Sequence, residues 1–160
     1  MAFSKENSPT AIRDFKAHLK EEALRTIREN LSDLNSQFLA LQEASSGETK
    51  SSAGDKYETG RETIRQSRAL LEKQLQTIRQ WESKIQQIPV EPVPDIREGA
   101  LISLDLGWVW VSVSFGKVVV QSSEIQGVSV ASPLILAMKG KTKGDVVAFR
   151  GRDIEILNIL

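Results

Sequence analysis

Two acidic side chains, Asp55 and Glu58, stand three residues apart in a polar segment, residues 51–62, that two glycines interrupt. Carboxylate oxygens are common ligands of hard divalent cations. Acids at the start of a helix also complement the helix dipole, and Thr59 and Glu62 have the Thr-x-x-Glu spacing of a capping box. Metal-assisting chemistry and a plain helix start are therefore both open for this segment.

A short row of basic side chains follows the acidic pair. Arg61, Arg65 and Arg68 are separated by four and three residues, a spacing that places them on one side of a helix. Cationic side chains supply the sequence-independent part of nucleic-acid binding, so this row could contact RNA phosphates. The alternative is a solvated face in which Glu58, Glu62 and Glu72 balance the arginines through helical pairs.

Two long helix-patterned arms must position these residues. The first covers about residues 8–44 and opens with Ser-Pro, a good helix start, and the second covers about residues 56–87. In both arms apolar residues recur at alternating spacings of four and three, which is typical of a coiled-coil seam. We predict an antiparallel coiled-coil hairpin over residues 1–88 with its tip at about 45–56. At 1.5 Å per residue, an arm of about 30 residues is about 45 Å long.

The pattern changes after the second arm. Residues 89–96 hold three prolines and favour an extended, semi-rigid linker. From there to residue 160, β-branched alternation and glycine-marked turns predict a small antiparallel β-sheet domain. A Ser-Pro pair opens one short helix at 132–138. The strands are expected at 100–105, 108–114, 117–121, 126–129, 146–150 and 153–160. The fold class is therefore α+β, with two domains and a linker.

The composition narrows the classes of function. Among 160 residues, 21 basic and 21 acidic side chains cancel, so nucleic-acid binding would need a local patch. There is no cysteine and one histidine, which leaves no thiolate metal site. No run reaches the roughly 18 apolar residues of a membrane span, and no signal peptide is evident at the start. We expect a cytoplasmic protein that does not bind membranes.

Residues 128–149 read Val-Ser-Val-Ala-Ser-Pro-Leu-Ile-Leu-Ala-Met-Lys-Gly-Lys-Thr-Lys-Gly-Asp-Val-Val-Ala-Phe, and Ile-Glu-Ile-Leu-Asn-Ile follows at 154–159. This block resembles the C-terminal domain of the Gre family of bacterial transcript-cleavage factors, in which a Ser-Pro-Leu helix, a Gly-Lys and Gly-Asp turn and two strands close an FKBP-like domain. The helical hairpin placed before it matches that family's layout. The resemblance covers most of the chain.

The resemblance implies that the hairpin enters the secondary channel of RNA polymerase and promotes cleavage of backtracked RNA by the polymerase's own active site. Asp55 and Glu58 would then help to hold a Mg²⁺ shared with the polymerase. The protein itself would be no enzyme, would bind no cofactor tightly and would act as a monomer on polymerase and nascent RNA. The implied RNA or polymerase contacts are Lys50, Lys56, Tyr57, Arg61, Arg65 and Arg68. The implied docking residues are Ser132, Pro133, Leu134, Lys141, Gly144 and Asp145.

Two alternatives stay open. The stretch from Tyr57 to Glu62 also resembles the family's Tyr-x-x-x-Lys/Arg-Glu, and in that register Lys50 and Ala53 take the acidic positions. The protein would then occupy the channel and regulate the polymerase without promoting cleavage. A folding helper, either a prolyl isomerase or a coiled-coil holdase, is the third hypothesis. The strand-rich domain has no tyrosine, which speaks against the aromatic pocket of an isomerase.

Overall fold

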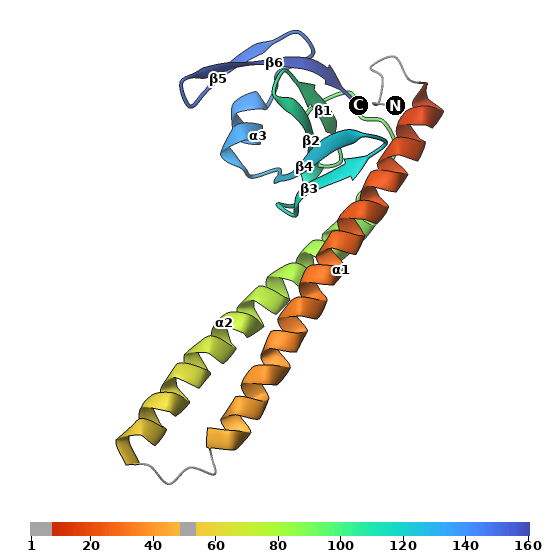
Figure 1. The fold of residues 1–160 in the computed structure, drawn as a ribbon. Coiled ribbons are helices and arrows are strands. Elements are labelled where there is room, and N and C mark those ends of the chain that lie inside the picture. Colours follow the sequence, from red (N-terminus) through yellow and green to blue (C-terminus); the bar gives the residue numbers. More distant parts are fainter. Residues whose placement is uncertain (1–7, 49–53) are drawn as a thin grey trace. The chain divides into compact units, whose positions relative to one another are not determined.

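The computed structural model describes the backbone of residues 8–48 and 54–160, and the side chains of residues 8–44 and 60–160. Two long helices precede a sheet of six strands with one short helix (Figure 1). The chain divides into two compact units, one formed by Met1–Thr26 with Ser83–Leu160 and the other by Ile27–Glu82. The α+β class and its two-part architecture are as predicted. The elements are α1 (Pro9–Glu48), α2 (Gly54–Gln87), β1 (Leu101–Leu104), β2 (Gly107–Ser112), β3 (Gly116–Val120), β4 (Ser123–Ser129), α3 (Pro133–Met138), β5 (Val146–Phe149) and β6 (Arg152–Ile159).

Helix α1 starts where the Ser-Pro pair predicts. The hydroxyl of Ser8 accepts a hydrogen bond from the backbone N–H of Ala11 at 3.2 Å, and the N–H of Ile12 donates to the Ser8 carbonyl at 3.0 Å. Pro9 fits the first helical position because its missing N–H would have no intrahelical partner there. The helix extends to Glu48, four residues beyond its predicted end, and α2 begins at Gly54, two residues before its predicted start.

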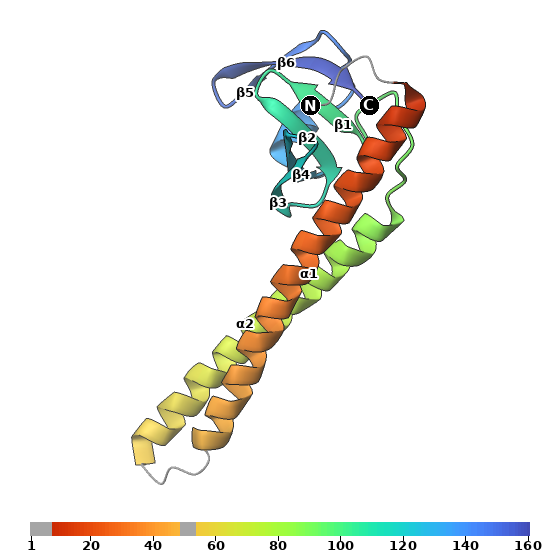
Figure 2. The same ribbon diagram turned by 45° about the vertical axis from the view of Figure 1, so that its right-hand side comes forward.

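In the unit Ile27–Glu82 the two helices run antiparallel and side by side (Figures 1 and 2). Arg28 of α1 pairs with Glu82 of α2 at 3.5 Å, and the guanidinium of Arg68 lies 5.3 Å from the ring centre of Phe38. Early residues of α1 therefore face late residues of α2. Ile27, Leu75 and Ile78 are buried in the seam, whereas Leu31, Leu34 and Phe38 are half-buried. A seam made by only two helices leaves one edge of its apolar side chains open to solvent.

The strands form one sheet in the order β3-β4-β2-β1-β6-β5. All six predicted strands are present, but the pairing is not fully antiparallel as predicted, because β2 pairs with β4 in parallel. The connection after β2 passes over β4, where a Cβ on Gly127 would lie 2.4 Å from the carbonyl oxygen of Val113 and 2.3 Å from Cε1 of Phe115. Only glycine leaves room for this crossing, which places β3 at the sheet edge and β4 beside β2.

The core of the sheet unit lies between one sheet face and α3. Successive side chains of a strand point to opposite faces, so Trp110 and Leu101 are buried on the other face, away from this core. The base of α1 contributes Phe15 and Leu19, both fully buried, to the same unit. The core cluster consists of Ala100, Ile102, Leu104, Val109, Val111, Val128, Ile135, Met138, Val147, Ile154 and Ile156.

Two lysines of α1 hold the proline-rich segment between α2 and β1. Lys16 Nζ donates to the carbonyls of Glu91 and Gly99 at 3.0 and 2.9 Å. One turn later, Lys20 Nζ donates to the carbonyls of Gln86 and Ile88 at 2.7 and 2.9 Å. The last carbonyls of a helix lack intrahelical partners, so Lys20 satisfies the end of α2 while Lys16 anchors the linker. Neither contact was predicted from the sequence.

Candidate functional site at the hairpin

The acidic pair lies in the first turns of α2, which begins at Gly54. Positions 55 and 58 are three residues apart on this helix and so belong to one of its faces. Lys56 and Tyr57 lie in the same turns, and Lys50 lies outside the described residues. An acid near a helix start also interacts favourably with the helix dipole, so position alone leaves the metal-assisting and structural interpretations both open.

The arginine row lies on α2 in the unit Ile27–Glu82, and its side chains are exposed. Arg65 Nη1 lies 3.6 Å from Glu62 Oε2, and Arg68 Nε lies 3.5 Å from Glu72 Oε1. The pairs with Glu62 and Glu72 expected in the solvated-face interpretation are therefore present, and the side chain of Glu58 lies outside the described residues. Ion pairs this exposed contribute at most about 1 kcal/mol, so a phosphate could replace either glutamate at small cost.

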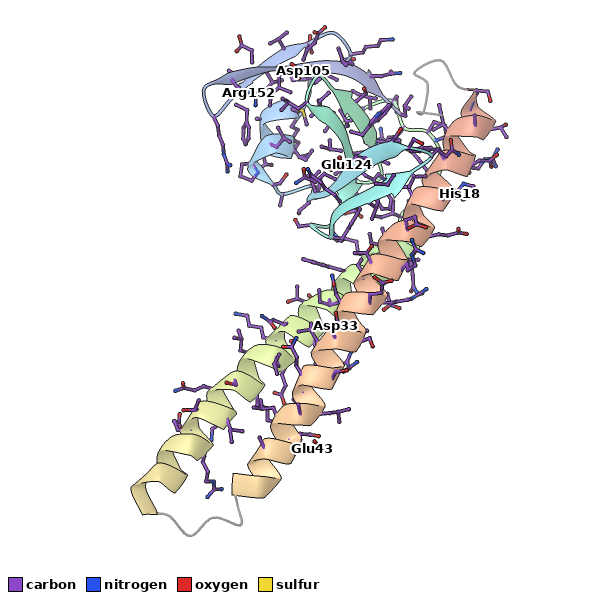
Figure 3. The ribbon with its side chains drawn as sticks, in the orientation of Figure 1. His18, Asp33, Glu43, Asp105, Glu124 and Arg152 are labelled. Atoms are coloured by element: carbon purple, nitrogen blue, oxygen red, sulfur yellow. The ribbon has the colours of Figure 1, made fainter. Side chains whose placement is uncertain are left out.

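No group of three or more histidine, aspartate or glutamate side chains with a metal-binding arrangement occurs in the described part of the chain. The ring of His18 (Figure 3) contacts its own helix, with Nδ1 3.0 Å from the carbonyl oxygen of Asp14. Two tip carboxylates alone suit a Mg²⁺ whose remaining ligands come from elsewhere. The side chains of Asp55 and Glu58 lie outside the described residues, so their metal-assisting role stays a prediction.

The predicted docking residues begin at α3. The Ser132 hydroxyl caps the helix by accepting a hydrogen bond from the N–H of Ile135 at 3.4 Å, and Pro133 is the first helical residue. Leu134 is half-buried and packs against the core of the sheet unit. These three residues therefore have a clear structural role, which is to start α3 and attach it to the sheet.

The remaining docking residues form the turn before β5. Gly144 has φ +92°, in the left-handed region, and its N–H donates to the Ile156 carbonyl at 2.7 Å. The Asp145 carboxylate accepts a hydrogen bond from the N–H of Thr142 at 2.8 Å, which closes the turn. Lys141 is exposed. The Gly-Asp pair thus sets the turn geometry, and Lys141 is its solvent-facing charge.

The hairpin carries a groove that was not predicted from the sequence. It has a volume of 610 Å³ and lies wholly within the unit Ile27–Glu82. Leu70, Gln74 and Trp81 line it from α2, just beside the seam residues Leu71 and Leu75. These three residues are separated by four and seven positions, so they share one face of α2. This spacing is the signal in the sequence that could have indicated the groove. The groove is lined by Asn30, Asp33, Leu34, Gln37, Leu70, Lys73, Gln74, Thr77, Ile78 and Trp81.

Fold and site define an α+β protein in which a helical hairpin precedes a six-stranded mixed sheet. None of the helices among the described residues is both long and apolar enough to cross a membrane. No protein-family model matches this sequence, and no curated protein matches it. Among solved structures the chain is similar to one described as the transcription factor Gfh1, with 18% identity and a TM-score of 0.38. That alignment covers 86% of this chain and 93% of the other.

Proposed function

We propose that this protein is a Gre-like transcription factor that binds RNA polymerase, inserts its hairpin tip into the secondary channel and promotes cleavage of backtracked RNA. The proposal is supported because the motifs that carry the sequence resemblance occupy matching elements of the fold. The Ser132-Pro133 pair starts α3, Gly144 and Asp145 form the turn before β5, and a hairpin precedes this domain. These are the places that the sequence resemblance assigns to them.

In this proposal the chain contributes two carboxylates and a basic row, and the polymerase contributes the catalytic centre. Asp55 and Glu58 would provide oxygen ligands at the tip. A Mg²⁺ held by these two carboxylates, together with one bound by the polymerase, would stabilise the attacking and leaving oxygens of an in-line displacement. Arg65 and Arg68 would exchange their exposed glutamate partners for RNA phosphates, since each ion pair is weak in water, and Arg61 would contribute a further positive charge.

The direct experiment adds the purified full-length chain to RNA polymerase and then to backtracked elongation complexes. We expect the two proteins to co-elute, and we expect short 3′ RNA fragments to form faster than in complexes without the added chain. Failure to bind polymerase would contradict the proposal as a whole.

A channel-occupying regulator without cleavage activity is the second candidate. The observation in its favour is the spacing of Tyr57, Arg61 and Glu62, which fits the alternative register and places Lys50 and Ala53 at the acidic positions. Binding to polymerase without faster RNA cleavage, together with inhibition of a known channel-binding factor, would select this candidate over the first.

A further inference from the structure

Strand β3 is an edge strand of the sheet, with β4 on one side. Its two-residue turn to β4 closes on the pair Val120 and Ser123, and the register continues through Val118. Residues of an antiparallel pair alternate between positions that exchange hydrogen bonds and positions that do not, so the main-chain groups of Lys117 and Val119 point away from β4. No backbone partner of these groups occurs in the part of the chain that the structure describes. Two N–H groups and two carbonyls can therefore pair with a further strand.

The β3 edge also has few of the charges that usually protect an edge strand from further pairing. Within three residues of either end of β3, the only charged side chain is Lys117, which already pairs with Glu124 of β4 at 3.1 Å. Val119, on the same edge, is 63% exposed. The other edge strand, β5, is better protected. The charged residues in the same span around it are Lys143, Asp145, Arg150 and Arg152.

An apolar hollow of 220 Å³ borders β3 on the sheet face that packs against α3. The register aligns Lys117 with Gln126 of β4 and Val109 of β2, so these three side chains share that face. A strand added outside β3 would place side chains beside Lys117 and Val119, from where an aromatic side chain can reach the hollow. The apolar residues that line it are Leu104, Leu106, Trp108, Val109 and Leu134, and the polar ones are Lys117, Glu124 and Gln126.

A second hollow, of 210 Å³, lies between the base of α1 and the end of β3, within the same compact unit. The Glu22 carboxylate gives it an acidic wall. Glu22 pairs with Arg25 on the surface of α1, and because such exposed pairs are weak, a second basic side chain can share the carboxylate. The residues that line this hollow are His18, Glu22, Val119, Val120 and Gln121.

We propose that β3 receives an extended segment of a partner protein as a further strand of the sheet. Main-chain hydrogen bonds to Lys117 and Val119 hold the segment, and the hollows beside the strand select its side chains. The apolar hollow takes an aromatic side chain, Val119 contacts an aliphatic one two residues away, and Glu22 attracts a basic one near α1. An extended chain supplies all of these because every second side chain points to the same face. This inference does not depend on the proposed function, since every residue involved belongs to the sheet unit.

Binding of a synthetic peptide to the full-length chain tests the proposal. The probe is acetyl-Lys-Thr-Phe-Thr-Leu-Thr-Lys-amide, in which Phe and Leu share one face of a strand and lysines lie at both ends. We expect saturable binding with a Kd of about 1 mM or below, measured from the NMR shifts of the β3 amides. Hydrogen exchange at the N–H groups of Lys117 and Val119 should become slower. The same peptide with N-methyl groups on Phe and Leu should not bind, because those two donors face β3.

Two matched variants locate the binding site. Val119→Lys places a charge on the β3 edge and should weaken peptide binding at least about tenfold. Val146→Lys alters a valine of similar exposure, 57%, on the β5 edge and should leave binding unchanged. Far-ultraviolet circular dichroism of both variants should match the native spectrum. No binding up to about 5 mM peptide, or equal effects of the two variants, would overturn the proposal. Sedimentation that shows a dimer of the peptide-free chain, lost in Val119→Lys, would assign the edge to a second copy instead and also overturn it.

Discussion

The side-chain ammonium of Lys16 donates a hydrogen bond of 2.9 Å to the carbonyl oxygen of Gly99, which lies 83 residues further along the chain. The side chain of Lys16 is fully buried. Burial lowers its pKa from 10.5 to about 8, and the Glu91 carboxylate partly offsets this effect. The base of α1 therefore holds the linker with a group whose charge changes above neutral pH.

The first prediction concerns the pH dependence of stability. Between pH 8 and 10.5 the unfolded chain keeps the Lys16 proton while the native chain has lost it. The unfolded state then binds more protons, so the Lys16 contribution to the free energy of unfolding rises with pH across this interval, by at most about 3 kcal/mol. The neutral amine still donates hydrogen bonds to both carbonyls.

Urea unfolding of the native chain and of Lys16→Met, from pH 7 to pH 10.5, measures this contribution. The two proteins share every other ionisable group, so the effects of those groups cancel in the difference between the two free energies of unfolding. That difference should shift in favour of the native chain as pH rises. If the two free energies of unfolding differ by the same amount at every pH, the prediction that Lys16 makes stability rise with pH is wrong.

The second prediction concerns the crossing over β4. Gly127→Ala should lower the free energy of unfolding by about 1–3 kcal/mol, because its Cβ would overlap both a backbone oxygen and the Phe115 ring. Gln126→Ala, at the exposed neighbouring position, should change stability by less than about 0.5 kcal/mol. Urea unfolding compares the two variants. If both variants change the free energy of unfolding by the same small amount, the connection after β2 does not pack tightly against Gly127.

The third prediction concerns two tight hairpins of the sheet whose turn residues both have positive φ. Gln121 and Ser122 join β3 to β4 with φ of 50° and 66°, and Arg150 and Gly151 join β5 to β6 with φ of 51° and 75°. Non-glycine residues are disfavoured in this left-handed region, and only the second hairpin has a glycine there. Ser122→Gly should therefore raise the melting temperature, whereas Gly151→Ala should lower it. A lower melting temperature for Ser122→Gly would contradict the turn geometry.

Local signals explain how much of the fold could be predicted. Ser8 and Pro9 mark the start of α1, Ser132 and Pro133 mark α3, and glycines mark the turns before β2 and β3. Each of these signals acts through its own backbone conformation or its nearest neighbours. The strand positions follow because alternation of side chains is also local, within two residues.

The parts that were missed depend on contacts between distant residues. Gly127 permits the parallel pairing of β2 with β4, yet in the sequence it is only an isolated glycine in a strand pattern. Lys16 is one of several lysines on a charged helix, and only the fold brings it to Gly99. At the candidate site, the sequence predicts which residues share a helix face, whereas the Arg68 stacking on Phe38 required the pairing of both helices.

The most direct test of the central claim replaces the two tip carboxylates. Asp55→Asn with Glu58→Gln keeps side-chain size and removes both charges, and Glu43→Gln, an exposed acid on α1 (Figure 3), is the matched control. We measure binding to RNA polymerase and the rate of RNA cleavage in backtracked complexes. The double variant should bind like the native chain but no longer accelerate cleavage, and the control should behave as native. Full acceleration of cleavage by the double variant would contradict the assignment of Asp55 and Glu58.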